Sequence, residues 1–247
     1  ESYITGNRSY KEKFLKYAEI MPKLIGNPLY YWTHMELVQI FGITEPLNKD
    51  SAEDIYKKAN AVLKDLSVQK LLEKFGVEYI ATTDDPFSDL HNHGDINGVK
   101  VRPTFRPDRC FSEGADKATL EERLDYFVSK GCKIADHGFD NFDDTENLEW
   151  LIEKCYEKGI VLQLHFGTFR NINSDALRAI GKDSGFDVFR DFVATDALAK
   201  LLDKMNAKLG GLPKIVLYPL NDACLRAVCA ISGAFPNVLV GAAWWVN

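Results

Sequence analysis

Six short apolar runs, each followed directly by polar groups, constrain the fold of this chain more than any other feature. In the clearest case, Ile160-Val161-Leu162 leads to His165, and the chain then leaves through a turn with Arg170 and Asn171. A continuous apolar run of this kind is typical of a strand buried on both faces. The predicted strands are 77–83, 99–105, 132–136, 160–165, 214–220 and 237–243.

Helical patterns separate most of these strands, over about 120–130, 146–158, 196–208 and 223–235. Repeated strand–helix units predict an α/β fold with a parallel sheet and right-handed crossovers. A closed (β/α)8 TIM-type barrel has eight strands, and this sequence contains six of them. We therefore expect residues 77–247 to form barrel strands 2 to 7, with the first and eighth strands outside the printed sequence.

Residues 1–76 have a different pattern and are predicted to be a helical insertion before the barrel. Apolar residues recur at helical spacing over 10–25 and 29–41, and further helices begin at Ser51 and Ser67. Asp54 follows Ser51 by three residues, a spacing that resembles a capping box.

The composition excludes several classes of protein. A net charge of −6 argues against nucleic-acid binding, which needs a basic surface. No apolar run reaches the roughly 18 residues of a membrane span. The five cysteines are an odd number without CxxC spacing, so we interpret them as reduced thiols packed as small apolar groups in a cytoplasmic protein. A thiolate nucleophile or a zinc site would need spacing that is absent.

Because the carboxyl ends of parallel strands meet at one edge, the polar groups that follow the strands are predicted to surround one cavity. These groups are Asp84, Asp85, Arg106, Asp108, Asp136, His137, His165, Arg170, Asn221, Asp222, Trp244 and Trp245. Guanidinium groups match a carboxylate, and histidine with a carboxylate can bind a divalent metal or move a proton. The set therefore implies a small, polar, anionic substrate. GxGxxG, P-loop and HExxH motifs are absent from the sequence.

Structural interpretations of the same residues stay open. Either aspartate of the Asp84-Asp85 pair could cap a helix, Arg106 could pair with Asp108, and His137 could be a buried, hydrogen-bonded histidine. Trp244 and Trp245 could belong to the core or stack on a sugar. The His91-x-His93 pair lies in a polar Gly/Asn segment, so we interpret it as a solvated loop and not as a metal site.

Several longer runs resemble one known family. They are ESYITG (1–6), GNPLYYWTHMEL (26–37), ATTDDP (81–86), PTFRPDR (103–109), ADHG (135–138), QLHFG (163–167) with the following Arg170-Asn171, and GAAWWVN (241–247). In collinear order across nearly the whole chain, they resemble uronate isomerase (glucuronate isomerase), a family of amidohydrolase-type barrels.

The resemblance implies an aldose–ketose isomerisation, of D-glucuronate to D-fructuronate and of D-galacturonate to D-tagaturonate, by proton transfer between C2 and C1 through an enediol. Such a step needs a base at the carbon and a donor at the oxyanion. The expected catalytic residues are His165, His137 and Asp85. The expected substrate-binding residues are Arg106 for the carboxylate, then Arg170, Asn171, Trp244 and Trp245. A divalent metal, zinc in the first place, is expected with His165 as a ligand.

The resemblance also shows departures. Members carry a first-strand HxH and an eighth-strand Asp-Ser-Arg run that supply metal ligands, and neither is in the printed sequence. We expect the 247-residue chain alone to be inactive, as an incomplete copy of a cytoplasmic enzyme that acts on a hexuronate and could form a homo-oligomer. The alternatives are a metal-dependent hydrolase of a small acidic substrate and a non-catalytic sugar-acid-binding protein.

Overall fold

The computed structural model describes residues 2–140, 142, 145–182, 184–190 and 195–242. They divide into two compact units, each with its own hydrophobic core. Of the described residues, the first unit contains those of 2–76 and 171–186, and the second contains those of 77–170 and 187–242. The segment 171–186 thus groups with the helices of the first unit and not with the sheet.

The first unit is helical, as the sequence predicts. Its helices are α1 (Tyr10–Ile20) with the 3-10 turn η1 (Met21–Leu24), α2 (Pro28–Phe41), α3 (Ala52–Leu63), α4 (Val68–Lys74) and α8 (Ser174–Ile180). Their buried core contains Ala18, Met21, Leu37, Ile43, Leu47, Ala52 and Ile55. The α8 helix has no counterpart among the predicted elements.

The capping box lies at α1 and not at α3, where the sequence pattern suggested one. Ser9 accepts a hydrogen bond from the N–H of Glu12, and the Glu12 side chain accepts one from the N–H of Ser9. Ser51 makes no side-chain cap, because its hydroxyl donates to the carbonyl oxygen of Pro46 (2.7 Å). The prediction failed because spacing alone does not reveal a competing acceptor outside the helix.

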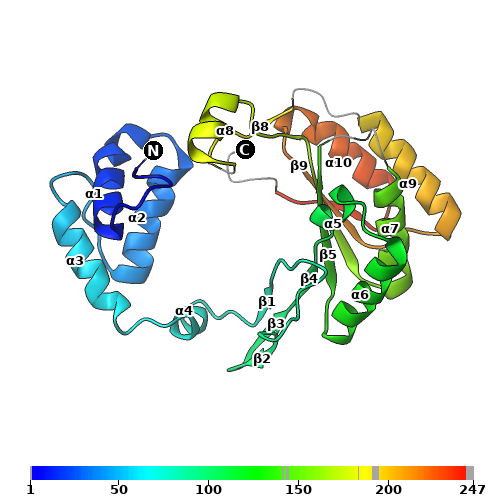
Figure 1. Cartoon of the computed structure of the whole chain (residues 1–247), viewed down its shortest axis with the longest axis horizontal. Helices are drawn as coiled ribbons and strands as arrows, with labels where there is room; N and C mark the ends of the chain where they lie inside the picture. Colours follow the sequence, from blue (N-terminus) through cyan, green and yellow to red (C-terminus); the bar gives the residue numbers. More distant parts are fainter. Residues whose placement is uncertain (1, 141, 143–144, 183, 191–194, 243–247) are drawn as a thin grey trace. The chain divides into compact units, whose positions relative to one another are not determined.

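The second unit contains a parallel five-stranded sheet with the order β10-β9-β6-β5-β4 (Figure 1). Its strands are β4 (Thr104–Phe105), β5 (Ile134–Phe139), β6 (Val161–Phe166), β9 (Ile215–Pro219) and β10 (Val238–Val240). Strand β1 (Tyr79–Ala81) pairs in parallel with β3 (Val99–Arg102), and an isolated parallel bridge joins Asp84 to Phe105. The connecting helices are α5 (Asp108–Ser112), α6 (Lys117–Ser129), α7 (Glu146–Lys158), α9 (Thr195–Leu209) and α10 (Leu225–Ala234), the last preceded by the 3-10 turn η2 (Asp222–Cys224).

All six predicted strands are present in the predicted order, so the α/β fold with a parallel sheet is confirmed. Three short strands were not predicted: β2 (Gly94–Ile96), which pairs antiparallel with β3, and β7 (Thr168–Phe169), which pairs antiparallel with β8 (Val188–Phe189). The predicted strand 99–105 is interrupted at Pro103, which has no N–H to give to a ladder. The predicted strand 132–136 instead runs from Ile134 to Phe139, so His137 lies inside it.

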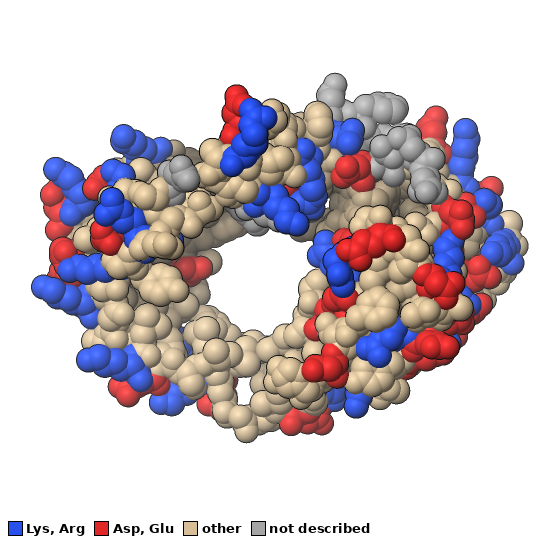
Figure 2. Space-filling view, viewed as in Figure 1, with Lys and Arg blue, Asp and Glu red and all other residues tan. Residues whose placement is uncertain are grey.

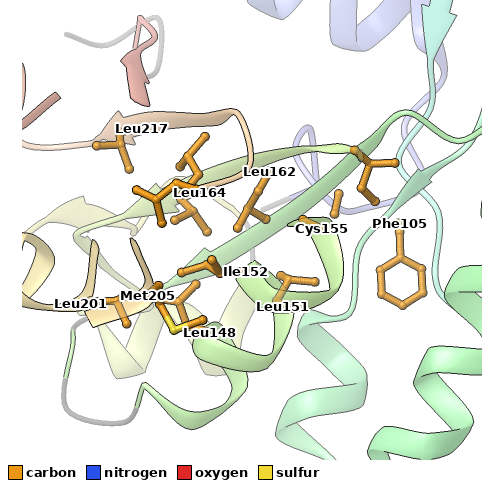
Figure 3. Packing of buried hydrophobic residues seen from close by; sticks show 14 of the residues in the cluster. Phe105, Leu148, Leu151, Ile152, Cys155, Leu162, Leu164, Leu201, Met205 and Leu217 are labelled. Atoms are coloured by element: carbon orange, nitrogen blue, oxygen red, sulfur yellow. The ribbon is translucent and has the colours of Figure 1, made fainter. Parts of the chain in front are cut away.

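The two faces of the five-stranded sheet differ in how deeply their side chains are buried. Along β6, Leu162, Leu164 and Phe166 are buried, whereas the alternate residues are only half-buried. The buried face packs on α7 and α9, where Leu162, Leu164 and Leu217 meet Leu148, Ile152, Leu201 and Met205 (Figure 3). Because paired residues of parallel strands point to the same side, the register places Asp136, Gln163, His165 and Tyr218 on the opposite face, which we call the polar face.

Acidic and basic side chains are interspersed over the helices of the second unit (Figure 2). Two lysines of α9 pair with two glutamates of α7: Lys204 with Glu149, and Lys208 with Glu153, each at 2.7 Å. Of the five cysteines, Cys110, Cys132 and Cys155 pack in the core as predicted, but Cys229 is exposed. In the described part of the chain, every helix is too short or too polar to cross a bilayer.

Candidate active site

Five polar side chains on or next to β4, β5 and β6 are joined by a network of contacts. We call Arg106, Asp108, Asp136, His137 and His165 the strand-end cluster. Arg106 follows β4, Asp108 opens α5, Asp136 and His137 lie on β5, and His165 lies on β6. These residues thus come from three neighbouring strands or the turn after one of them, and the parallel register brings the strands' carboxyl ends together.

On the polar face, three of these groups form a continuous chain of contacts. A guanidinium nitrogen of Arg106, Nη1, lies 3.1 Å from Asp136 Oδ2. The other carboxylate oxygen, Asp136 Oδ1, lies 2.8 Å from His165 Nε2. The His165 ring stacks on Tyr218, with ring centroids 4.6 Å apart and planes 10° apart, and the Tyr218 hydroxyl accepts a hydrogen bond from Gln163. A carboxylate, a guanidinium and an imidazole therefore face one region.

Asp108 links this chain of contacts to His137. Its Oδ2 accepts from Arg106 Nε at 2.9 Å, and its Oδ1 lies 2.6 Å from His137 Nδ1. Burial by itself would raise the pKa of Asp108, but His137 and Arg106 lower it by more, so this carboxyl is held ionised. Burial likewise disfavours the charged form of Arg106, yet Asp108 and Asp136 raise its pKa overall.

The sequence predicts that His137 shares a cavity with His165, but the two side chains project from opposite faces of the sheet. In the register of β5 and β6, His137 pairs with the buried Leu164, whereas Gly138 pairs with His165. The His137 ring lies edge-on to Phe111 (5.3 Å between centroids) and stacked beside Phe139 (5.8 Å). It is buried, as the structural interpretation of the sequence anticipated, and it reaches the polar face only through Asp108.

Asp136 and His165 are the two side chains that could begin a metal site. Asp136 Oδ1 is buried and lacks a hydrogen bond among the described residues, because the 2.8 Å approach of His165 Nε2 does not have hydrogen-bond geometry. Such an oxygen fits a cation. However, the described residues contain no group of three His, Cys, Asp or Glu side chains that could hold a metal ion. Zinc sites use three or four protein ligands, so the described part of the chain supplies an incomplete set.

Asp85 and Asp84 are engaged in other contacts. Asp85 Oδ2 accepts from Arg109 Nε at 2.9 Å, and this bond is the largest cause of a lowered pKa of Asp85. Asp84 Oδ2 accepts from the hydroxyl of Thr82 (2.5 Å) and lies 3.4 Å from His93 Nε2. The interpretation of His93 as a solvated loop residue was wrong: its side chain is only 9% exposed, because it folds back onto the end of β1.

The remaining predicted substrate-binding residues lie in different environments. Arg170 Nη1 donates to Asp187 Oδ2 at 2.8 Å. Asn171 has a left-handed backbone (φ 52°) and belongs to the first unit. Trp244 and Trp245 lie outside the described residues. Asn221, which was predicted only as one of the polar groups that follow the strands, caps η2 through the N–H of Ala223 and donates to the carbonyl oxygen of Arg190.

Sequence reasoning missed Gln163, Tyr218 and Arg190. Strict alternation from His165 identifies Gln163, and the same period along β9 identifies Tyr218, because both point to the polar face. Arg190 follows β8, a two-residue strand with no sequence signal. Its Nε donates to the carbonyl oxygen of Thr168 (3.1 Å) and its guanidinium lies over the ring of Phe169.

The family model described as glucuronate isomerase matches residues 1–117 and 141–247. The curated uronate isomerases of Caldanaerobacter subterraneus subsp. tengcongensis and Caldicellulosiruptor saccharolyticus are 33% and 36% identical to this chain, all of which is covered. The chain spans 67% of the length of each.

Solved structures agree with these relatives. The uronate isomerase of Thermotoga maritima matches all of the chain with a TM-score of 0.90 and 30% identity, over 67% of its own length. The glucuronate isomerase of Caulobacter crescentus matches 97% of the chain with a TM-score of 0.83 and 24% identity, which supports the fold. The predicted barrel-type α/β fold is thereby confirmed, and the chain belongs to the glucuronate isomerase family.

Proposed function

We propose that the protein is a uronate isomerase, which converts D-glucuronate to D-fructuronate and D-galacturonate to D-tagaturonate. The observation that carries the proposal is the contact chain Arg106–Asp136–His165 at the carboxyl edge of a parallel sheet, in a member of this family. A guanidinium matches the carboxylate of a sugar acid. An imidazole beside a carboxylate can take up and return a proton near neutral pH.

In the proposed reaction, His165 removes the proton from C2 of the open-chain aldose and returns it to C1. Between the two steps the substrate is an enediol, and a proton also passes from the C2 oxygen to the C1 oxygen, so the reaction is redox-neutral within one molecule. The Asp136 carboxylate, 2.8 Å from His165 Nε2, stabilises the positive charge that the imidazole gains with the proton. Arg106 binds the carboxylate at the far end, which fixes the substrate for transfer.

The charge of the strand-end cluster favours an additional cation. Asp108 and Asp136 are two carboxylates facing one guanidinium, Arg106. An anionic substrate would meet this excess negative charge unless a metal ion is present. A divalent cation, zinc in the first place, would be held by Asp136 Oδ1, which makes no hydrogen bond among the described residues, together with further ligands, while His165 keeps its lone pair for the proton transfer. When bound, it would supply positive charge for the substrate oxygen.

The test is conversion of D-glucuronate by the full-length protein, followed with a reductase that consumes NADH as the ketose forms. We expect His165→Asn to lower kcat at least 100-fold with a small change in thermal stability, because the side chain is 36% exposed. Chelation is expected to lower activity and added zinc to restore it. Binding of uronate without turnover would contradict the proposal, and so would release of ammonia from amide substrates without isomerisation.

We also infer a cytoplasmic location. Three free thiols pack in the core as apolar groups, which is the ordinary use of cysteine in a reducing compartment.

A further inference from the structure

Asp108 contacts both Arg106 and His137, and the proposed proton transfer does not use it. Its Oδ2 receives Arg106 Nε–H at 2.9 Å, and its Oδ1 is 2.6 Å from His137 Nδ1. The N–H of Gly138 also lies close to both oxygens, at 3.2 and 3.3 Å. An ionised carboxylate only accepts hydrogen bonds, so each of these neighbours must be a donor.

Two of the donors to Asp108, His137 and the N–H of Gly138, lie on a strand of the sheet. Gly138 belongs to β5, and the His137 ring is buried between Phe111 and Phe139. His137 must carry its proton on Nδ1 to donate to Asp108. The carboxylate is therefore held from the helix-covered side of the sheet, while its other oxygen reaches Arg106, which faces the polar side.

The Arg106 guanidinium is held at two nitrogens. Asp108 takes Nε–H, and Asp136 lies 3.1 Å from Nη1. The third nitrogen, Nη2, donates no hydrogen bond to another of the described residues. Since the guanidinium is planar, fixing Nε and Nη1 also fixes the direction in which Nη2 presents its donors.

We propose that Asp108 is a positioning residue of the substrate-carboxylate site: it holds Arg106 by Nε so that Nη2 donates to the uronate carboxylate. The proposal rests on the proposed function. His137 has a structural part in it, as the buried donor that keeps Asp108 in place. Without Asp108, Arg106 would keep its charge but lose its orientation. The affinity for the uronate would therefore fall more than the rate of isomerisation.

The main test is Asp108→Asn in the full-length protein. In asparagine one of the two carboxylate oxygens is replaced by an NH2 donor, so the two positions that now accept from Arg106 and from His137 cannot both accept. We expect KM for D-glucuronate to rise at least tenfold, equivalent to about 1.4 kcal/mol of binding free energy, with kcat within about threefold of the wild type. The dissociation constant of D-gluconate, an acid that cannot isomerise, should rise by the same factor in calorimetry.

Asp89→Asn is the matched control. Asp89 and His91 form another carboxylate–imidazole pair (2.5 Å), but on an exposed loop without an arginine contact among the described residues. It should leave KM and gluconate affinity unchanged. In an Arg106→Met background, Asp108→Asn should raise the gluconate dissociation constant less than twofold further, because the two residues act as one unit.

A measurement on the wild type covers the case in which Asp108→Asn does not fold. The Arg106 Nε–H resonance, assigned by its loss in Arg106→Lys, should keep its chemical shift when gluconate binds, while the Nη resonances move. A gluconate-induced shift of Nε–H would overturn the proposal. So would wild-type KM and gluconate affinity in a folded Asp108→Asn protein, whatever its kcat or Tm. Failure of the wild type to isomerise uronates would instead refute the proposed function.

Discussion

The ring of Tyr218 lies between His165 and Gly241, and this contact makes Gly241 a sensitive position. A Cβ at Gly241 would come within 2.2 Å of Tyr218 Cε1, and the Gly241 backbone is fixed by its N–H bond to the carbonyl oxygen of Leu217. The ring would have to move away, and with it the surface on which His165 stacks.

We therefore expect Gly241→Ala to lower kcat/KM for D-glucuronate at least tenfold in the coupled assay. Gly233→Ala is the control, because a Cβ there meets nothing within 4 Å and alanine favours the helix α10. Equal activity of the two variants would show that the Tyr218 ring does not support His165.

The ion pair of Asp85 and Arg109 should appear in the pH dependence of stability. Arg109 lowers the pKa of Asp85, so the folded state holds the carboxylate more ionised than the unfolded state does. The stabilisation is complete above the unfolded pKa of about 4 and disappears as the pH falls through the lower folded value.

Asp85→Asn should accordingly reduce the free energy of unfolding at pH 7 by less than about 1 kcal/mol, because Arg109 is largely exposed. Urea unfolding of both proteins from pH 7 to pH 2 measures the difference, which should shrink toward zero at the acidic end. A difference that grows on acidification would contradict the assigned ion pair.

How much of the site the sequence predicts depends on where each strand ends. Arg106, Asp136 and His165 follow from the pattern of apolar runs, and the structure brings them together. The same pattern groups His137 with them because it predicts that this strand ends at residue 136. The strand, β5, continues to Phe139, and alternation turns His137 toward the helices. The close approach of Tyr218 to Gly241 joins the end of β9 to the residue after β10, and no local pattern encodes it.

At the level of elements, helices and strands of the regular strand–helix units are predicted well. The helix predicted over 146–158 is α7, whose bounds are Glu146–Lys158. Short elements were missed: α5 is five residues long, and β7 and β8 have two residues each. Segments of this length have too little periodicity to be recognised in a sequence. Whether they form depends on the strands and helices that they pair with.

The capping boxes give a matched pair of variants at this scale. Glu12 closes a reciprocal cap with Ser9, whereas Asp54 has the same spacing from Ser51 without that contact. Glu12→Gln should lower the free energy of unfolding of the helical unit, because a neutral amide oxygen accepts the hydrogen bonds from Ser9 more weakly than the carboxylate does. Asp54→Asn should cost less, and chemical denaturation followed by circular dichroism compares the two. A larger loss for Asp54→Asn would contradict the cap assignment.

For the whole molecule, the sequence indicates a helical part and a strand–helix part, but not the membership of residues 171–186. That segment leaves the sheet after β7 and returns at β8, and it groups with the helices of the first unit. A chain excursion of this kind depends on long-range contacts, for which apolar periodicity gives no signal.

Because the two units have separate buried cores, we expect a cavity in one core to destabilise that unit and not the other. Met21 and Leu164 are fully buried, the first in the core of the helical unit and the second in the core of the sheet unit. Replacing either by alanine should cost about 2–5 kcal/mol through lost burial and the cavity left behind. Hydrogen exchange measured by mass spectrometry locates the effect. We expect Met21→Ala to speed exchange in α1 to α3 and leave β5 and β6 protected, and Leu164→Ala to do the reverse. Faster exchange in both units with either variant would mean that the two cores unfold as one.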